Sequence, residues 1–127
     1  MKLIDLVERE LNWELNPDRR YDRFPGITVL ANVEDIWANV NPEWLITNSS
    51  ETNRIGKRFD KAVQHFQSNQ PMDPPVIAFS GEHSRYPIQV VNGRHRIAAA
   101  VQLGQQWIPI IVDPKQLNDI KQVIHIK

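Results

Sequence analysis

The chain has no cysteine among its 127 residues and no formal net charge. The absence of cysteine excludes disulfides, thiolate metal sites and any reaction that uses a catalytic thiol. It also fits a reducing compartment, so we expect a cytoplasmic protein. No apolar run approaches the roughly 20 residues needed to cross a bilayer, and the first residues do not resemble a signal peptide. We therefore expect no membrane partner.

The neutral total hides an uneven charge distribution. Residues 1–50 contain five basic and nine acidic residues, whereas residues 51–127 contain ten basic and six acidic ones. Between Glu82 and Asp113 there is no acid, while Arg85, Arg94 and Arg96 all lie there. The local field, rather than the total charge, decides where an anion binds. We predict an anion site in this segment, with only weak or salt-sensitive attraction of a polynucleotide by the whole molecule.

The apolar pattern predicts one α+β domain over residues 1–127, with a small mixed sheet packed with helices. We divide it into a helical N-terminal extension (1–26), a core (27–112) and a C-terminal helix and strand (113–127). The expected helices are 2–13, 54–68, 97–103 and 114–120, with a short helical turn near Pro42. The expected strands are 27–30, 76–80, 88–91, 107–112 and 123–126, and residues 32–36 are expected to form a loop or turn.

A basic turn stands between the strand at 88–91 and the Ala-rich helix that Gly104 ends. It reads Asn92-Gly93-Arg94-His95-Arg96. The start of a helix presents unpaired N–H groups and the positive end of the peptide dipole, and this suits a phosphate. The sequence therefore predicts that residues 92–96 bind a phosphate group.

Two residues of this turn have a structural as well as a functional interpretation. Gly93 allows a phosphate to approach the backbone closely, but it is also an ordinary turn residue. Arg96 can grip phosphate oxygens with its planar fork, or it can form a salt bridge to an acid such as Asp73 or Glu82. Both interpretations remain open from the sequence.

Hydrolysis would need an acid and a base as well as an anchor. A carboxylate must activate water or hold a divalent metal such as Mg²⁺. The candidate acids are Glu34 and Asp35 after the first strand of the core, Asp73 before the second strand and Glu82 in the hairpin. Glu34 and Asp35 are favoured by topology, or they are two ordinary surface acids. His95 is a candidate proton donor or phosphate contact, and otherwise packs at the helix start. No metal ligand is identified from spacing.

The same stretch resembles the central motif of the ParB/sulfiredoxin superfamily. The likeness rests on residues 92–100, on Leu103-Gly104 and on 108–112, and it extends over roughly Ile27 to Val112. It implies the fold of that superfamily and a turn that binds the phosphates of a nucleotide such as ATP or CTP. The superfamily includes a peroxiredoxin-repairing enzyme, CTP-binding partition proteins, nucleases and a free-serine kinase.

Two departures from these relatives narrow the function. Arg94 occupies the place of the sulfiredoxin cysteine, so thiol repair is excluded, and its contact with a reacting phosphate or with solvent is left open. Partition proteins carry a Gly-Glu-Arg-Arg turn and further domains, whereas this chain continues for about thirty residues after Arg96, so we do not expect a complete partition protein.

Three functions follow as hypotheses. The first is a protein that binds nucleotide or nucleic-acid phosphate, as a Mg²⁺-dependent nuclease or NTPase. The alternatives are a non-enzymatic regulator of plasmid or phage type that binds DNA, nucleotide or protein, and a small-molecule kinase. The basic residues on the second long helix are either a nucleic-acid track or its solvated face; they are Arg54, Lys57, Arg58 and Lys61.

Overall fold

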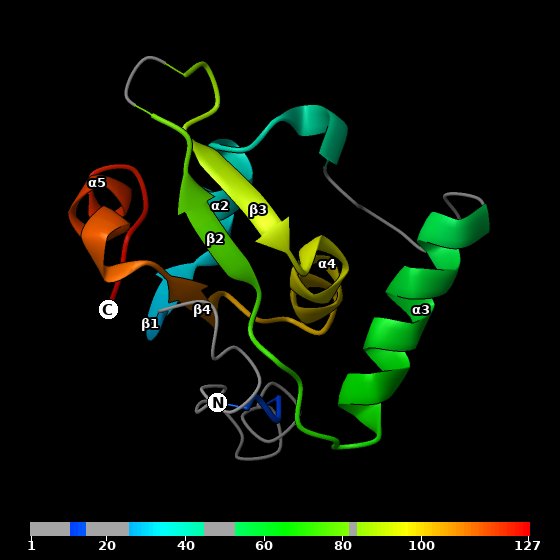
Figure 1. Cartoon of the computed structure of the whole chain (residues 1–127). Coiled ribbons are helices and arrows are strands. Elements are labelled where there is room, and N and C mark those ends of the chain that lie inside the picture. Colours follow the sequence, from blue (N-terminus) through cyan, green and yellow to red (C-terminus); the bar gives the residue numbers. More distant parts are fainter. Residues whose placement is uncertain (1–10, 15–25, 45–52, 82–83) are drawn as a thin grey trace.

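Four strands form a mixed sheet at the centre of the structure, a computed structural model that describes residues 11–14, 26–44, 53–81 and 84–127. Their order across the sheet is β1-β4-β2-β3, and helices pack against them (Figure 1). The strands are β1 (Ile27–Asn32), β2 (Val76–Phe79), β3 (Ile88–Asn92) and β4 (Trp107–Val112). The predicted α+β class is thus confirmed, and the four core strands lie within two residues of their predicted bounds.

Strand β4 lies between two neighbours and is the most buried strand, which explains its continuous apolar sequence. It runs antiparallel to β1 from Ile27↔Val112 to Asn32↔Trp107. Its pairing with β2 is parallel and lies at Val76↔Ile111. Pro109 on β4 has no N–H to donate. It precedes the point where β2 begins to pair with β4, so no hydrogen bond between these two strands is lost at this residue.

The helices differ in their relation to the sheet (Figure 1). Helix α4 (Arg94–Gln102) follows β3 directly, and the long helix α3 (Asn53–Gln67) packs on α4. The short helix α2 (Val33–Ala38) follows β1, and α5 (Leu117–Lys121) lies beside β2. Two 3₁₀ turns complete the described elements, η2 (Pro42–Trp44) and η3 (Pro114–Gln116).

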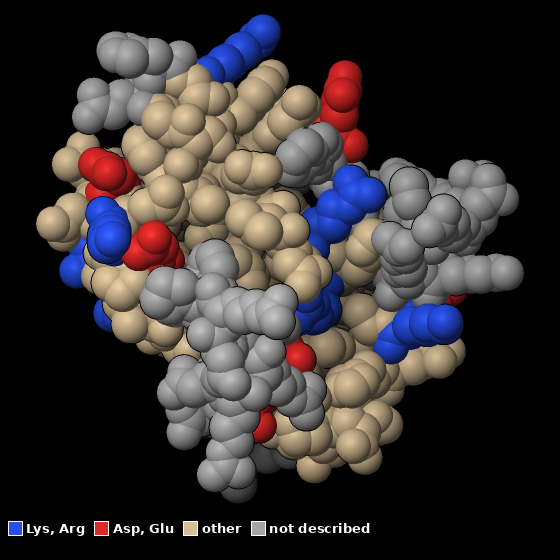
Figure 2. Space-filling view, in the orientation of Figure 1, with Lys and Arg blue, Asp and Glu red and all other residues tan. Residues whose placement is uncertain are grey.

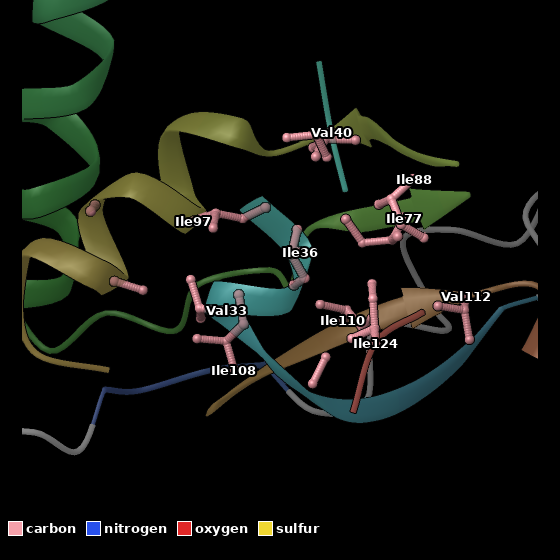
Figure 3. Packing of buried hydrophobic residues seen from close by; sticks show 14 of the residues in the cluster. Val33, Ile36, Val40, Ile77, Ile88, Ile97, Ile108, Ile110, Val112 and Ile124 are labelled. Atoms are coloured by element: carbon pink, nitrogen blue, oxygen red, sulfur yellow. The ribbon is translucent and has the colours of Figure 1, made fainter. Parts of the chain in front are cut away.

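Branched aliphatic side chains from α2, α4 and the sheet point toward one another and form the core (Figure 3). Burial of each such side chain contributes about 1.5–3 kcal/mol to folding. The largest fully buried residues are mostly isoleucines: Ile36, Ile77, Ile97, Ile108, Ile110, Ile111, Ile120 and Ile124. The site described below therefore stands at the edge of a rigid, closely packed layer.

The prediction of a loop at residues 32–36 is wrong, because α2 begins at Val33. The side chain of Asn32 accepts a hydrogen bond from the Asp35 amide (3.1 Å), and Glu34 and Asp35 complement the helix dipole in the first turn. Val33 and Ile36 are buried on one face of this helix. The capping signal was present in the sequence, but six residues are too few to show helical periodicity.

The predicted N-terminal helix is contradicted where the structure describes it. Its first residues, 2–10, lie outside the described part of the chain. At its end, Trp13 forms a parallel bridge with Met72 instead. The Glu14 amide donates to the Met72 carbonyl (2.8 Å), and the Met72 amide donates to the Asn12 carbonyl (2.9 Å). A backbone pairing between residues distant in sequence overrides the local helical pattern here.

The C-terminal predictions are partly confirmed. The helix predicted at 114–120 is found as η3 followed by α5. The predicted strand at 123–126 makes one antiparallel bridge, between Ala31 and Ile126. Among the helices of the described residues, none has the length and apolar character that spanning a bilayer requires.

Candidate phosphate-binding site

The basic segment, residues Asn92–Arg96, joins the edge strand β3 to helix α4. The pairs Val76↔Asn92 and Ile77↔Val90 leave Val91 as an extra residue, so β3 ends in a bulge. The Val91 side chain is exposed at this point. A bulge bends the strand and redirects the residues that follow it. The bend turns the chain from the sheet into α4.

Gly93 occupies a position that only glycine fits. Its φ of 100° lies in the left-handed region. A Cβ atom there would lie 2.8 Å from the Pro75 Cβ and 2.9 Å from an Arg96 Nη atom. The carbonyl of Gly93 accepts the first intrahelical bond of α4, from the Ile97 amide (3.0 Å). The glycine is therefore required by packing and backbone conformation, whatever it binds.

Helix α4 begins three residues earlier than predicted, so Arg94, His95 and Arg96 form its first turn. The N-cap, Gly93, has no side chain to bond the first amides, and the turn contains no acid. The start of α2 differs, because Asn32 caps it and two acids follow. The positive end of a helix dipole repels the two arginines beside it, and an anion bound there would offset this repulsion. The start of α2 therefore has its capping side chain and negative charges within the chain, whereas the start of α4 has neither in its own cap and first turn.

The Arg96 side chain folds back over Gly93 and contacts the segment that precedes β2. Its Nη1 donates to the backbone carbonyl of Asp73 (2.7 Å). The predicted structural alternative is an ion pair with an acid such as Asp73 or Glu82. Glu82 lies outside the described residues, and the contact that the structure shows with Asp73 is to its main chain. A guanidinium has five N–H donors. This contact orients the fork beside the helix start and leaves it the capacity to bind an oxyanion.

Basic side chains gather on the face that carries α4 and α3 (Figure 2). Arg94, His95 and Arg96 are each partly buried, and Lys61 on α3 is exposed. The side chains predicted to form a track with Lys61, on residues 54, 57 and 58, lie outside what the structure describes. Helices α3 and α4 pack together, so α3, which carries Lys61, adjoins the helix that carries the basic segment.

The structure does not bring the two candidate catalytic acids to the basic segment. Glu34 is exposed on α2. The Asp35 Oδ2 atom accepts hydrogen bonds from the His125 amide (2.8 Å) and the His125 Nδ1 (2.6 Å). His125 belongs to the segment that bridges the outer side of β1, whereas α4 starts from β3 at the opposite edge of the sheet. Their catalytic roles, and that of His95, stay predictions.

Among the described residues, Asp73 is an acid that the fold places near the basic segment. Its carbonyl accepts the Arg96 bond, and its Oδ1 is buried. Mg²⁺ at phosphate sites is commonly held by one or two carboxylates together with the phosphate oxygens. Within the described ranges, no group of three acidic, histidine or cysteine side chains is arranged to hold a metal ion. A metal here would depend on the ligand for part of its coordination.

The contact of Asp35 with His125 was not foreseen, because ninety residues separate them and no local pattern links them. The bond from the His125 amide, then that from its ring, holds the pKa of the Asp35 carboxyl below its ordinary value of 3.8. A lowered pKa means that this carboxylate stabilises the fold above pH 3.8 and loses that contribution as the pH falls through the lowered value.

We therefore expect the stability advantage of the wild type over Asp35→Asn to be greatest near neutral pH and to shrink below pH 3.8. Urea denaturation of both proteins between about pH 2.5 and 7 would measure it. A difference that stays constant over this range would contradict a charge-dependent contact, since the amide that replaces the carboxyl group in the variant does not titrate.

No protein-family model, curated protein or solved structure matches this chain. The likeness to the ParB/sulfiredoxin superfamily thus rests on the motif of residues 92–112, and it stays a prediction.

Proposed function

We propose that this protein binds a phosphate group of a nucleotide or nucleic acid at the start of α4. The observation that carries the proposal is the contrast between the two helix starts. α2 is capped by Asn32 and acids, whereas α4 has no side-chain cap, no acid and three basic or titratable residues in its first turn. Such an arrangement costs stability in the absence of an anion and gains it when one binds.

The ligand is an oxyanion for geometric reasons. The Ile97 amide makes the first intrahelical bond of α4, to the Gly93 carbonyl, so the amides of Arg94 and Arg96 precede it and, as at any helix start, face away from the helix. The Arg96 fork lies beside them, held by Asp73. Amides and guanidinium together bind a phosphate through several charge-assisted hydrogen bonds.

The test is a titration with ATP, CTP, GTP and short single- and double-stranded DNA, each with and without Mg²⁺. Arg94→Ala and Arg96→Ala are compared with Arg85→Ala, which removes an exposed arginine on the β2–β3 connection, where it stacks on Tyr86. We expect about a tenfold or greater loss of affinity in the first two variants, because a hydrogen bond to a charged group is worth about 1.5–3 kcal/mol. Arg85→Ala should retain affinity within about twofold.

Equal affinity in the wild type and both α4 variants would contradict the proposed site. Binding of a nucleic acid is recognised by its salt dependence, because the affinity for a polynucleotide falls steeply between low and high salt. A mononucleotide that binds while DNA does not would assign the site to nucleotides.

A second function, Mg²⁺-dependent hydrolysis of a phosphoester or phosphoanhydride, is favoured by the position of Asp73 next to Arg96. In this proposal the basic segment holds the phosphate and Asp73 provides a carboxylate for Mg²⁺ or water. Release of phosphate and cleavage of DNA are measured in the same titrations. Turnover that is lost in Asp73→Asn, with binding retained, supports hydrolysis; binding without turnover in the wild type assigns the protein to the non-enzymatic binding class.

A further inference from the structure

Among the described residues, the outer side of β1 pairs with no other strand of the sheet, and a short stretch of chain covers part of it. We call this stretch, His125–Lys127, the edge segment. The Asn32 amide donates to the His125 carbonyl (3.0 Å), and the Lys127 amide donates to the Leu30 carbonyl (2.9 Å). In Figure 1 this end of the chain lies beside β1. The segment thus acts as a partial fifth strand.

The edge segment is held by surface contacts of His125 and Lys127 and by the partly buried Ile126, which packs against the margin of the core, whereas the residue before the segment is buried in the core. Ile124 is 2% exposed, but the His125 side chain is 84% exposed. The Asp35 carboxylate holds both the amide and the ring of His125, and the Lys127 ammonium lies 4.4 Å from the centre of the Trp107 ring. Exposed contacts of this kind are individually weak. Detachment at Ile124 would therefore remove only the partly buried Ile126 side chain from the margin of the core.

Apart from the edge segment, β1 carries neither of two sequence features that often protect an exposed edge, a charged residue or a proline. Its sequence, Ile27-Thr28-Val29-Leu30-Ala31-Asn32, contains no charged residue and no proline. Backbone groups of alternate residues point to the same edge, so those of Thr28 face outward together with those of Leu30 and Asn32. Ile27, at the start of β1, is 38% exposed. An uncharged, β-branched edge of this kind pairs readily with another strand.

We propose that the edge segment is a removable cover and that its detachment lets β1 pair antiparallel with β1 of a second copy of this chain. A second copy is the occupant that fits, because two uncharged β1 edges meet without like-charge repulsion and antiparallel pairing of identical strands is self-complementary. The Asp35–His125 contact holds the cover closed. This role of Asp35 is independent of the phosphate site.

The experiment compares Asp35→Ala with Glu34→Ala. Both remove an acid from the first turn of α2, but only Asp35 contacts the edge segment. Amide hydrogen exchange at Lys127 and Asn32 reports detachment, and the Ile111 amide, which donates to the Pro75 carbonyl (2.9 Å), reports whether the sheet stays folded. We expect about tenfold faster exchange at the two edge amides in Asp35→Ala, unchanged exchange at Ile111, and no change in Glu34→Ala.

Light scattering with size-exclusion chromatography then measures association. Asp35→Ala is expected to form a dimer at concentrations where Glu34→Ala has the same mass as the wild type. Adding Ile27→Lys, which places a charge on the β1 edge, is expected to restore that mass. Equal edge exchange in Asp35→Ala and the wild type overturns the proposal. Detachment without dimerisation overturns it as well, as does a dimer that survives Ile27→Lys.

Discussion

Gly93→Ala is expected to lower the free energy of unfolding by about 2–6 kcal/mol, because two costs add in this variant. A non-glycine residue in the left-handed region costs about 1–3 kcal/mol, and an added methyl in a packed position costs about the same. The methyl would lie 2.8 Å from the Pro75 Cβ and 2.9 Å from its Cα, and a backbone atom cannot simply rotate away.

The matched control is Gly81→Ala. Gly81 also has a positive φ, of 121°, but nothing lies within 4 Å of the position that its Cβ would take. Its substitution should therefore cost only the conformational strain, about 1–3 kcal/mol. Urea denaturation followed by tryptophan fluorescence measures both. Equal losses in the two variants would show that contact with Pro75 and Arg96 does not limit position 93.

Gly93→Ala also tests whether the orientation of the Arg96 side chain affects phosphate binding when its charge is kept. The new methyl takes space that the guanidinium occupies, 2.9 Å from one of its nitrogens. Arg96 would then lose its contact with the Asp73 carbonyl while keeping its charge. A phosphate affinity that falls in Gly93→Ala as far as in Arg96→Ala would show that the orientation of the fork matters, and not only its charge.

Ile110→Ala is expected to cost about 2–5 kcal/mol of unfolding free energy. Ile110 is fully buried on β4, between the side chains of the sheet and the covering helices (Figure 3). Truncation removes buried apolar surface and leaves a cavity that a closely packed core fills only in part. A loss of this size is a large fraction of the roughly 5–15 kcal/mol that stabilises a whole domain.

Ile27→Ala is the control for Ile110→Ala, because it is the same substitution on a neighbouring strand. Ile27 is partly exposed, so its truncation should cost well under half as much. Thermal and urea denaturation of both variants give the comparison. Similar losses at the two positions would contradict the placement of the core between β4 and the covering helices.

Much of the secondary structure could be predicted because it follows local rules. The strand at Trp107–Val112 is a continuous apolar run, and α3 shows helical spacing over fifteen residues. The start of α4 was misplaced by three residues, since Arg94, His95 and Arg96 resemble a turn by composition. A glycine with positive φ at position 93 allows the helix to begin immediately after β3.

In the candidate site, too, local features could be predicted and contacts between distant segments could not. Residues 92–96 are contiguous, so the sequence alone groups them beside a helix start. Asp35–His125 could not be predicted, because it joins segments that meet only when the sheet is assembled. Asp73 was a predicted partner of Arg96, but through its carboxylate and not through the backbone carbonyl that accepts the bond. Glu34 and Asp35, which follow a strand, were therefore the favoured catalytic acids from the sequence. Asp73, which the fold brings closer to the basic segment, was a less favoured candidate than Glu34 and Asp35.

By itself, the amino-acid sequence determined the absence of thiol chemistry, the α+β class and the basic character of the stretch before the Ala-rich helix, because composition and short-range periodicity settle these. Tertiary structure alone decided that this helix starts without a cap, that Arg96 turns back to the Asp73 carbonyl, and that Asp35 faces the opposite edge of the sheet. These outcomes depend on strand order and register, which arise from contacts between residues far apart in the chain.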